Sequence, residues 1–192
     1  MREDALAHKP TLAGERVRLR PFTEEDIQGM GPILADEDVQ LLTGSVSSRA
    51  QARGVSPVLD ERTLAWYRSR HTQGDRLDLA VIDLASGRCV GEVVLNELDV
   101  DNCSCNFRIL LGPEGRDRGL GTEATRLLVD YAFETTELHR VELEVYAFNP
   151  RARRAYEKAG FQLEGVRREA LRLDEQWIDA VVMSRLRPGS AS

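Results

Sequence analysis

The chain has 192 residues, of which 42% are hydrophobic and 30% are charged, and these values fit a single globular domain. Its formal net charge of −6 argues against nucleic acid as the main ligand, because phosphate backbones are bound by clustered Lys and Arg. No stretch is apolar enough for a signal peptide or a membrane span, so we expect a cytoplasmic protein without a membrane partner. The cysteines and histidines lack the spacing of a disulfide framework or a metal site, and we expect no metal.

The first third of the chain predicts one strand and two helices. Residues 1–15 are polar and are expected to be flexible, and the alternation in Val17–Pro21 predicts a strand. Thr23 and the carboxylates that follow it predict a helix N-terminus, because a hydroxyl cap and early negative charge both stabilise that end. Residues 44–57 are small and polar without sustained periodicity, so we expect a mobile loop. Asp60 is expected to cap the next helix.

The middle of the chain predicts an antiparallel meander. Apolar residues alternate with polar ones from Leu77 to Asp83 and again from Cys89 to Leu98, with a polar turn between the two runs. A third strand follows through Phe107–Leu111. Neighbouring strands joined by short turns pair in antiparallel fashion.

The C-terminal part predicts alternating helices and strands. The expected elements are a helix at 122–135, a strand at 141–147, a helix at 150–159, and strands at 161–168 and 177–185. Together with the meander they indicate one mixed α/β (α+β) domain over residues 1–192, with a central sheet and a frayed tail at 187–192.

The loop before the helix at 122–135 carries the most specific signal. Gly119 and Gly121 have no Cβ, so consecutive backbone N–H groups can turn toward one anion. The positive end of the helix adds to this attraction. We therefore expect a phosphate or pyrophosphate site that needs no metal.

Two other interpretations of these glycines were considered. They could simply permit helix entry. Gly119-x-Gly121-x-x-Ala124 also matches the dinucleotide fingerprint, which would make the protein an NAD(P)-dependent enzyme. That fingerprint requires its first glycine directly after a parallel strand, whereas residues 112–118 intervene here after a meander.

Two segments resemble the signatures of GNAT N-acetyltransferases. Arg116-x-x-Gly119-x-Gly121 is similar to the acyl-CoA pyrophosphate motif, and the run from Asn149 to Phe161 is similar to the second signature. Residues 163–169 resemble the RimJ/RimL branch, which also contains spermidine N-acetyltransferases. The resemblance implies a central mixed, mostly antiparallel sheet of about seven strands flanked by helices, in which a splayed parallel strand pair holds the cofactor. It also implies acetyl-CoA (coenzyme A) as the co-substrate.

The resemblance implies the following cofactor-binding residues: Ile109, Leu110, Leu111, Arg116, Asp117, Arg118, Gly119, Leu120, Gly121, Thr122, Asn149 and Arg154. Residues 107–111 and 141–147 would run parallel and splay apart, so that the pantetheine amides pair with free backbone groups. We expect a β-bulge at Ile109–Leu111 to open this gap and a backbone N–H there to stabilise the oxyanion. Asn149 is also a sufficient helix cap by itself.

Tyr156 and Glu144 are the candidate catalytic residues. By resemblance, Tyr156 protonates the leaving thiolate, and an ordinary phenol with a pKa near 10 keeps its proton at neutral pH. An amine must also lose a proton before it attacks, and Glu144 is the first candidate base, with Glu92 the second. Tyr156 could instead be a core residue, and Glu144 could simply face solvent.

The expected reaction is direct transfer of an acetyl group from acetyl-CoA to a primary amine. The acceptor is left open among a protein N-terminus, an amino-acid-like metabolite, a polyamine and an aminated antibiotic. A charged Arg108 departs from the family pattern on its strand. A non-catalytic acyl-CoA-binding regulatory module is the alternative function, and a homodimer is left open.

Overall fold

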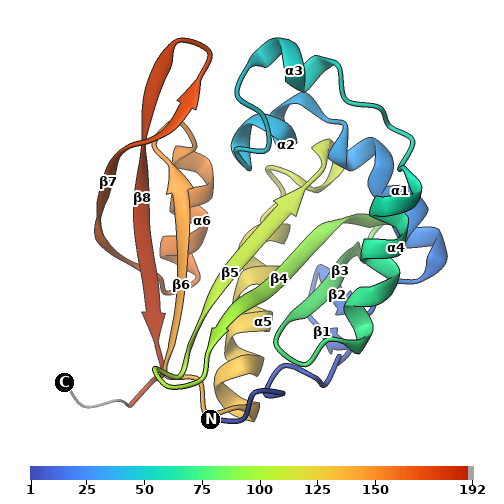
Figure 1. Cartoon of the computed structure of the whole chain (residues 1–192). Coiled ribbons are helices and arrows are strands. Elements are labelled where there is room, and N and C mark those ends of the chain that lie inside the picture. The colour runs from blue at the N-terminus through green and yellow to red at the C-terminus, as the bar shows by residue number, and fades with distance from the viewer. Residues whose placement is uncertain (190–192) are drawn as a thin grey trace.

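The computed structural model of the chain describes residues 1–189. It contains a sheet of eight strands in the order β1-β2-β3-β4-β5-β6-β8-β7, with helices packed on both faces (Figure 1). The strands are β1 (Leu12–Ala13), β2 (Val17–Arg20), β3 (Leu77–Asp83), β4 (Cys89–Asp99), β5 (Ser104–Leu111), β6 (Arg140–Tyr146), β7 (Gln162–Leu173) and β8 (Gln176–Leu186). The helices are α1 (Glu24–Leu34), α2 (Glu37–Leu42), α3 (Arg49–Arg53), α4 (Glu61–Ser69), α5 (Leu120–Thr135) and α6 (Pro150–Lys158), with short 3-10 turns η1 (Arg70–Thr72) and η2 (Pro113–Gly115).

The expected mixed, mostly antiparallel sheet is confirmed, with eight strands rather than about seven. β5 and β6 are its parallel neighbours, and they pair only where Ser104–Asn106 lies beside Arg140–Glu142. Beyond these residues the two strands separate, as their ribbons show (Figure 1). β5 stays paired with β4, and β6 stays paired with β8. The facing backbone groups beyond Asn106 and Glu142 therefore have no strand partner, and they can bind a ligand instead.

The two faces of the sheet are covered by different helices. On one face α5 and α6 pack over the larger core, which includes Phe107 of β5 and Leu143 of β6. On the other face α1 and α4 pack over a smaller core, which Leu110 of β5 joins. Because successive strand residues point to opposite faces, Arg108 and Glu144 lie on the α1 side of the sheet. The splayed strands thus present different side chains to the two faces.

The expected β-bulge at Ile109–Leu111 is absent from this described strand. β4 and β5 pair without a shift of register between Gly91–Asn96 and Asn106–Leu111. The nearest irregularity is in β4, where Val90 is an extra residue in the pairing with β3. The gap beside β5 opens because two regular strands diverge after a short pairing, and no inserted residue in β5 is needed.

The segment 44–57 is not the irregular loop that its composition predicts. It contains α3, whose N-terminus is capped by the Ser48 hydroxyl. Ala52 of this helix is fully buried against Leu41 and Leu173. A helix of five residues is too short to show periodicity in sequence, and it is held here by tertiary packing.

The N-terminal leader also has structure that its sequence did not predict. β1 pairs with β2, and the side chain of Leu6 is only 2% exposed. The Lys9 ammonium donates hydrogen bonds to three backbone carbonyls. At the other end, Arg187 donates to the carbonyls of Leu138 and Thr136. We expected a frayed tail at 187–192, and residues 190–192 of it lie outside the described residues.

Candidate active site

The N-terminus of α5 is open to an anion. Gly119 is its N-cap residue and has no side chain to accept a hydrogen bond. The other α-helices of the described chain are each capped by a side chain, from Thr23, Asp36, Ser48, Asp60 and Asn149. The first N–H groups of a helix have no intrahelical acceptor, so those of α5 remain available to a ligand, and the helix dipole favours a negative one.

The two glycines of this loop are needed for different reasons. Gly119 has a φ of 79°, in the left-handed region that other residues adopt only with strain. Gly121 has no such constraint, but a Cβ at this position would lie 3.2 Å from Cδ1 of Leu111. A larger side chain there would push the helix away from the end of β5. Both glycines thus have a steric reason for their places in the loop, while their binding of an anion stays a prediction.

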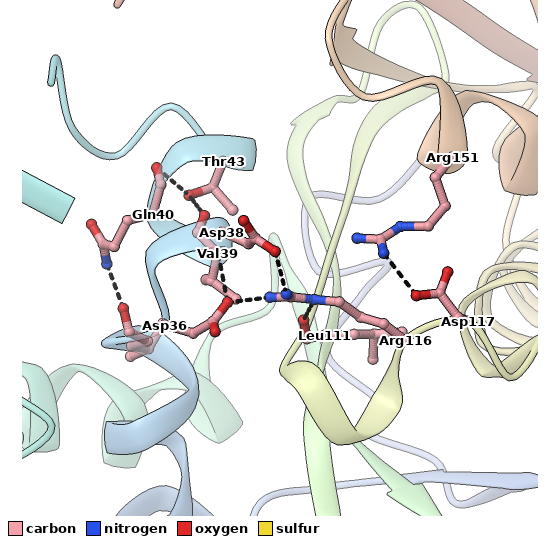
Figure 2. Close-up of polar contacts among 10 residues, drawn as sticks. Asp36, Asp38, Val39, Gln40, Thr43, Leu111, Arg116, Asp117 and Arg151 are labelled. Atoms are coloured by element: carbon pink, nitrogen blue, oxygen red, sulfur yellow. Dashed lines mark hydrogen bonds and ion pairs between the residues drawn. The ribbon is translucent and has the colours of Figure 1, made fainter. Parts of the chain in front are cut away.

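The Arg116 side chain is held by contacts with other parts of the chain, and its binding of a phosphate stays a prediction. Its side chain is 11% exposed, and the guanidinium donates to the carbonyl of Leu111 (2.8 Å), to Asp38 (3.0 Å) and to Asp36 (Figure 2). Asp36 also caps α2 by accepting from the N–H of Val39 (3.0 Å). Arg116 thus ties the anion-binding loop to the end of β5 and to the start of α2, and its charge is neutralised by two carboxylates.

Arg118 and Leu120 do not take the positions expected for cofactor ligands. Arg118 pairs with Asp83 of β3 at 3.0 Å and 3.1 Å, because the turn at Gly119 directs it away from the gap. Leu120 is 1% exposed and belongs to the core. Neither side chain lines the cleft, so these two predictions are not supported for the side chains. Only the backbone of Leu120 remains available.

The gap between β5 and β6 opens into a cleft with a volume of about 700 Å³. The predicted site residues that line it are Ile109, Leu110, Leu111, Arg116, Asp117, Gly119, Gly121, Thr122, Glu144, Asn149, Arg154 and Tyr156. Side chains from both faces of the sheet contribute, so the cleft passes through the sheet at the divergence of the two strands. A ligand arm can enter from the α5 side and meet a second molecule from the α1 side.

Several residues that line the cleft were missed by the sequence analysis. Thr43 follows α2, and nothing in its local sequence marks it as a site residue. Tyr146 of β6 reaches the α2 segment, since a Cβ on Gly44 would lie 2.3 Å from the Tyr146 hydroxyl. Lys158 lies within the second family signature and lines the cleft without an ion pair in the described chain. Its place in that signature was the available signal.

Polar residues of the loop before α5 and of the first turns of α6 bound the α5 side of the cleft. Asn149 accepts a hydrogen bond from the N–H of Ala152 at 3.1 Å, so its oxygen caps α6 and its amide nitrogen is left to donate. Arg151 pairs with Asp117 at 3.0 Å across the loop (Figure 2). Arg154 is exposed and has no ion pair among residues 1–189. A donor amide and an unpaired cation fit an amide-containing, phosphorylated ligand.

Tyr156 is buried on the α5 side, with its ring in edge contact with Phe107. Burial alone raises the pKa of its hydroxyl above the usual value, because the phenolate would be poorly solvated. The hydroxyl has no hydrogen-bond partner in the described chain, although the residue lines the cleft. A protonated phenol at this place can donate to a group inside the cleft.

The two candidate bases have opposite environments. Glu144 is exposed on the α1 side of β6 and forms an ion pair with Arg167 of β7. Glu92 of β4 is buried beside Tyr67 of α4, and burial raises its pKa to about 7, with Asp78 adding to the effect. Its Oε2 has no hydrogen-bond partner in the part of the chain that is described. Glu92 does not line the cleft, whereas Glu144 does.

No helix of residues 1–189 is long and apolar enough to cross a membrane. Nor do three His, Cys, Asp or Glu side chains gather as a metal site within this part of the chain.

The fold and the cleft define an enzyme class that binds a phosphorylated, amide-containing cofactor through a sheet opening, and comparison with known proteins identifies it. The acetyltransferase (GNAT) domain matches residues 16–162. The chain is 32% identical to the probable N-acetyltransferase YjcK of Bacillus subtilis over 123 aligned residues. The alignment covers 64% of this chain and 68% of YjcK. It is 31% identical to the spermidine N(1)-acetyltransferase of Escherichia coli K12 over 113 aligned residues, and this alignment covers 59% of each protein.

The solved structures agree on the fold. The spermidine N-acetyltransferase from Vibrio cholerae, in complex with CoA and spermine, superposes with a TM-score of 0.76 at 22% identity, over 91% of this chain and 97% of that one. The chain therefore belongs to the GNAT acetyltransferase family, whose members use acetyl-CoA. The expected resemblance to the RimJ/RimL-like branch is confirmed.

Proposed function

We propose that this protein transfers the acetyl group of acetyl-CoA to a primary amine by direct attack. The observation that carries the proposal is the juxtaposition of the uncapped N-terminus of α5 with a cleft that crosses the sheet beside a buried phenol. When bound, acetyl-CoA supplies an activated thioester. The protein supplies anion binding, positioning and proton transfer, which are the main sources of rate in such a reaction.

The residues on the α5 side would hold the cofactor. The N–H groups at Gly121 and Thr122, freed by the absence of a side-chain cap, would bind the pyrophosphate. The amide nitrogen of Asn149 would donate to the pantetheine arm. Arg154 and Lys158, which have no ion pair in the described chain, would attract the remaining phosphate. Arg116 would hold the shape of the loop from behind.

Proton transfer would use the two faces of the sheet separately. Tyr156 would donate its proton to the leaving thiolate from the α5 side, where burial keeps the phenol protonated. Glu144 would receive the amine proton, through water, on the α1 side. Its ion pair with Arg167 must open for this, because the guanidinium occupies the carboxylate.

The amine acceptor is proposed only as a class at this stage. The relatives include spermidine N(1)-acetyltransferases and an L-amino acid N-acetyltransferase of Escherichia coli, so both polyamines and amino acids enter the first panel. A protein N-terminus and an aminated antibiotic complete it.

The test is CoA thiol release from acetyl-CoA, measured with that panel of primary amines. Release above the rate without amine supports the proposal. Tight CoA binding without release for any amine would favour a non-catalytic acyl-CoA-binding regulatory module instead. Glu144→Gln and Glu92→Gln, assayed from pH 6 to pH 9, distinguish the two bases: the variant that abolishes the acidic limb of the kcat/KM profile marks the base.

A further inference from the structure

Most of the charged residues that line the cleft form ion pairs, either with one another or with residues outside it. Arg116 pairs with Asp36, Arg151 with Asp117, and Arg167 with Glu144. Among the cations that line the cleft in the described chain, those without an ion pair are Arg108, Arg154 and Lys158. Arg154 and Lys158 belong to α6, on the cofactor side. Arg108 stands alone on the other side.

Arg108 lies beside the point of reaction. It precedes Ile109 in β5, at the start of the unpaired stretch where the two strands have separated. Its side chain lies on the face opposite Phe107, with Leu110 and with Glu144 of the neighbouring strand. The acceptor must approach from this face, because α5 and α6 occupy the other.

Among residues 1–189, the neighbouring carboxylates form no ion pair with the Arg108 guanidinium. Glu92 is near enough to be influenced by its charge, but Glu92 is buried beside α4, does not line the cleft and forms no ion pair with Arg108. Glu142 is held by Arg140 at 2.9 Å. A guanidinium presents a planar fork of N–H donors that fits one carboxylate, and it stays charged at all working pH values.

We propose that the acceptor of this enzyme is a primary amine that also carries a carboxylate, and that Arg108 binds this carboxylate. The inference rests on the proposed acetyl transfer and narrows its substrate class. Bidentate pairing would orient the amine toward the thioester from a residue adjacent to the reacting centre. The same unpaired positive charge repels the extra ammonium groups of a polyamine, which would have to be brought close to it.

Glu97 provides the rival interpretation. It also lines the cleft without an ion pair in the described chain, and a carboxylate could hold the distal ammonium of a diamine. It lies in β4 just after Asn96, which pairs with Asn106, so it is displaced along the sheet from Arg108 toward the start of β5. The two residues therefore predict opposite acceptor charges, and substitution of each separates the predictions.

The experiment compares matched acceptors that differ in one charge. The free amino acid L-alanine is paired with L-alaninamide, and a peptide amide that begins with Asp is paired with one that begins with Asn, which separates free amino acids from acidic peptides as the source. Spermidine is the polyamine arm. Initial rates give kcat/KM for each, corrected to the free-amine form. We expect the carboxylate member of at least one pair to be preferred.

Arg108→Gln should lower the ratio of kcat/KM for the acid over its neutral partner by about 10- to 100-fold, the usual worth of a charge-assisted hydrogen bond. Arg168→Gln is the matched control, because Arg168 is exposed on β7, lies outside the cleft and carries the same charge. It should leave the ratio as it is. Glu97→Gln should also leave the ratio within about twofold, since this substitution removes no direct contact with the acceptor carboxylate.

Preference for spermidine, lost in Glu97→Gln and unaffected in Arg108→Gln, would overturn the inference and leave the acetyltransferase activity in place. Absence of thiol release with every amine would instead defeat the proposed function. Calorimetry with L-alanine and with the peptide amide that begins with Asp, each in the presence of CoA, then decides the role of Arg108: binding of either that Arg108→Gln abolishes supports it, and no binding of either overturns it.

Discussion

Replacement of Arg116 tests whether this residue ties the loop in place or contacts the cofactor. Arg116→Met keeps most of the aliphatic bulk but removes the donors to Leu111, Asp36 and Asp38. Because the Arg116 side chain is only 11% exposed, the loss of these bonds should cost about 3 kcal/mol of unfolding free energy. For a chain of this length such a loss corresponds to a fall in Tm of about 6–12 °C.

Asp36→Asn breaks the same ion pair from the other side. An Asn caps a helix as well as an Asp does, so the start of α2 should persist while the pair with Arg116 is lost. If Arg116 is a tie, both variants lower Tm without ligand and weaken CoA binding to similar extents, because both loosen the same loop. Arg153→Met is the control, since its exposed pair with Glu157 should contribute under about 0.5 kcal/mol.

The contrary result would be clear in thermal melts with and without CoA. A phosphate ligand at Arg116 predicts that Arg116→Met loses the Tm rise induced by CoA while Asp36→Asn retains it, since that rise depends on ligand concentration relative to Kd. An unchanged Tm for ligand-free Arg116→Met would refute the structural reasoning directly.

Three further predictions concern the cleft and the buried carboxyl. Tyr156→Phe should lower kcat far more than it changes the KM for acetyl-CoA, and an unchanged kcat would remove the proton-donor role. Because burial raises the pKa of Tyr156 above its usual range, the pH profile of kcat below pH 9 should have the same shape in the variant as in the wild type. Gly119→Val should strain a residue at φ 79°, and Gly121→Val should press on Leu111, so each should weaken CoA binding in a calorimetric titration; wild-type affinity in both contradicts the loop geometry. Glu92 has a folded pKa of about 7 against an ordinary 4.5, so the folded protein binds this proton more tightly and loses stability as pH rises between those values, by at most about 3 kcal/mol. Urea unfolding of Glu92→Gln should show less loss between pH 5 and pH 8 than the wild type, and parallel profiles would show that Glu92 is ionised in the fold.

Local sequence patterns predicted the structure correctly where its cause lies within one short segment of the chain. Thr23 predicted the start of α1, and the structure shows a full capping box with Asp26. The glycines at 119 and 121 predicted an anion site at the start of a helix, and in the structure Gly119 is the N-cap of α5 without a side-chain cap. Alternation predicted the β3–β4 hairpin and the buried face of β6.

The sequence by itself thus determined the family, the order of most strands and helices, and the loop at the start of α5. The tertiary structure decided what depends on distant partners: the burial of Ala52 that holds α3, the carboxylates that neutralise Arg116, and the absence of an ion pair to Arg108 within residues 1–189. The physical reason is the distance along the chain over which each interaction acts. Periodicity and capping act over a few neighbouring residues, whereas the charge balance of a cleft is set by side chains that folding brings together from separate parts of the chain.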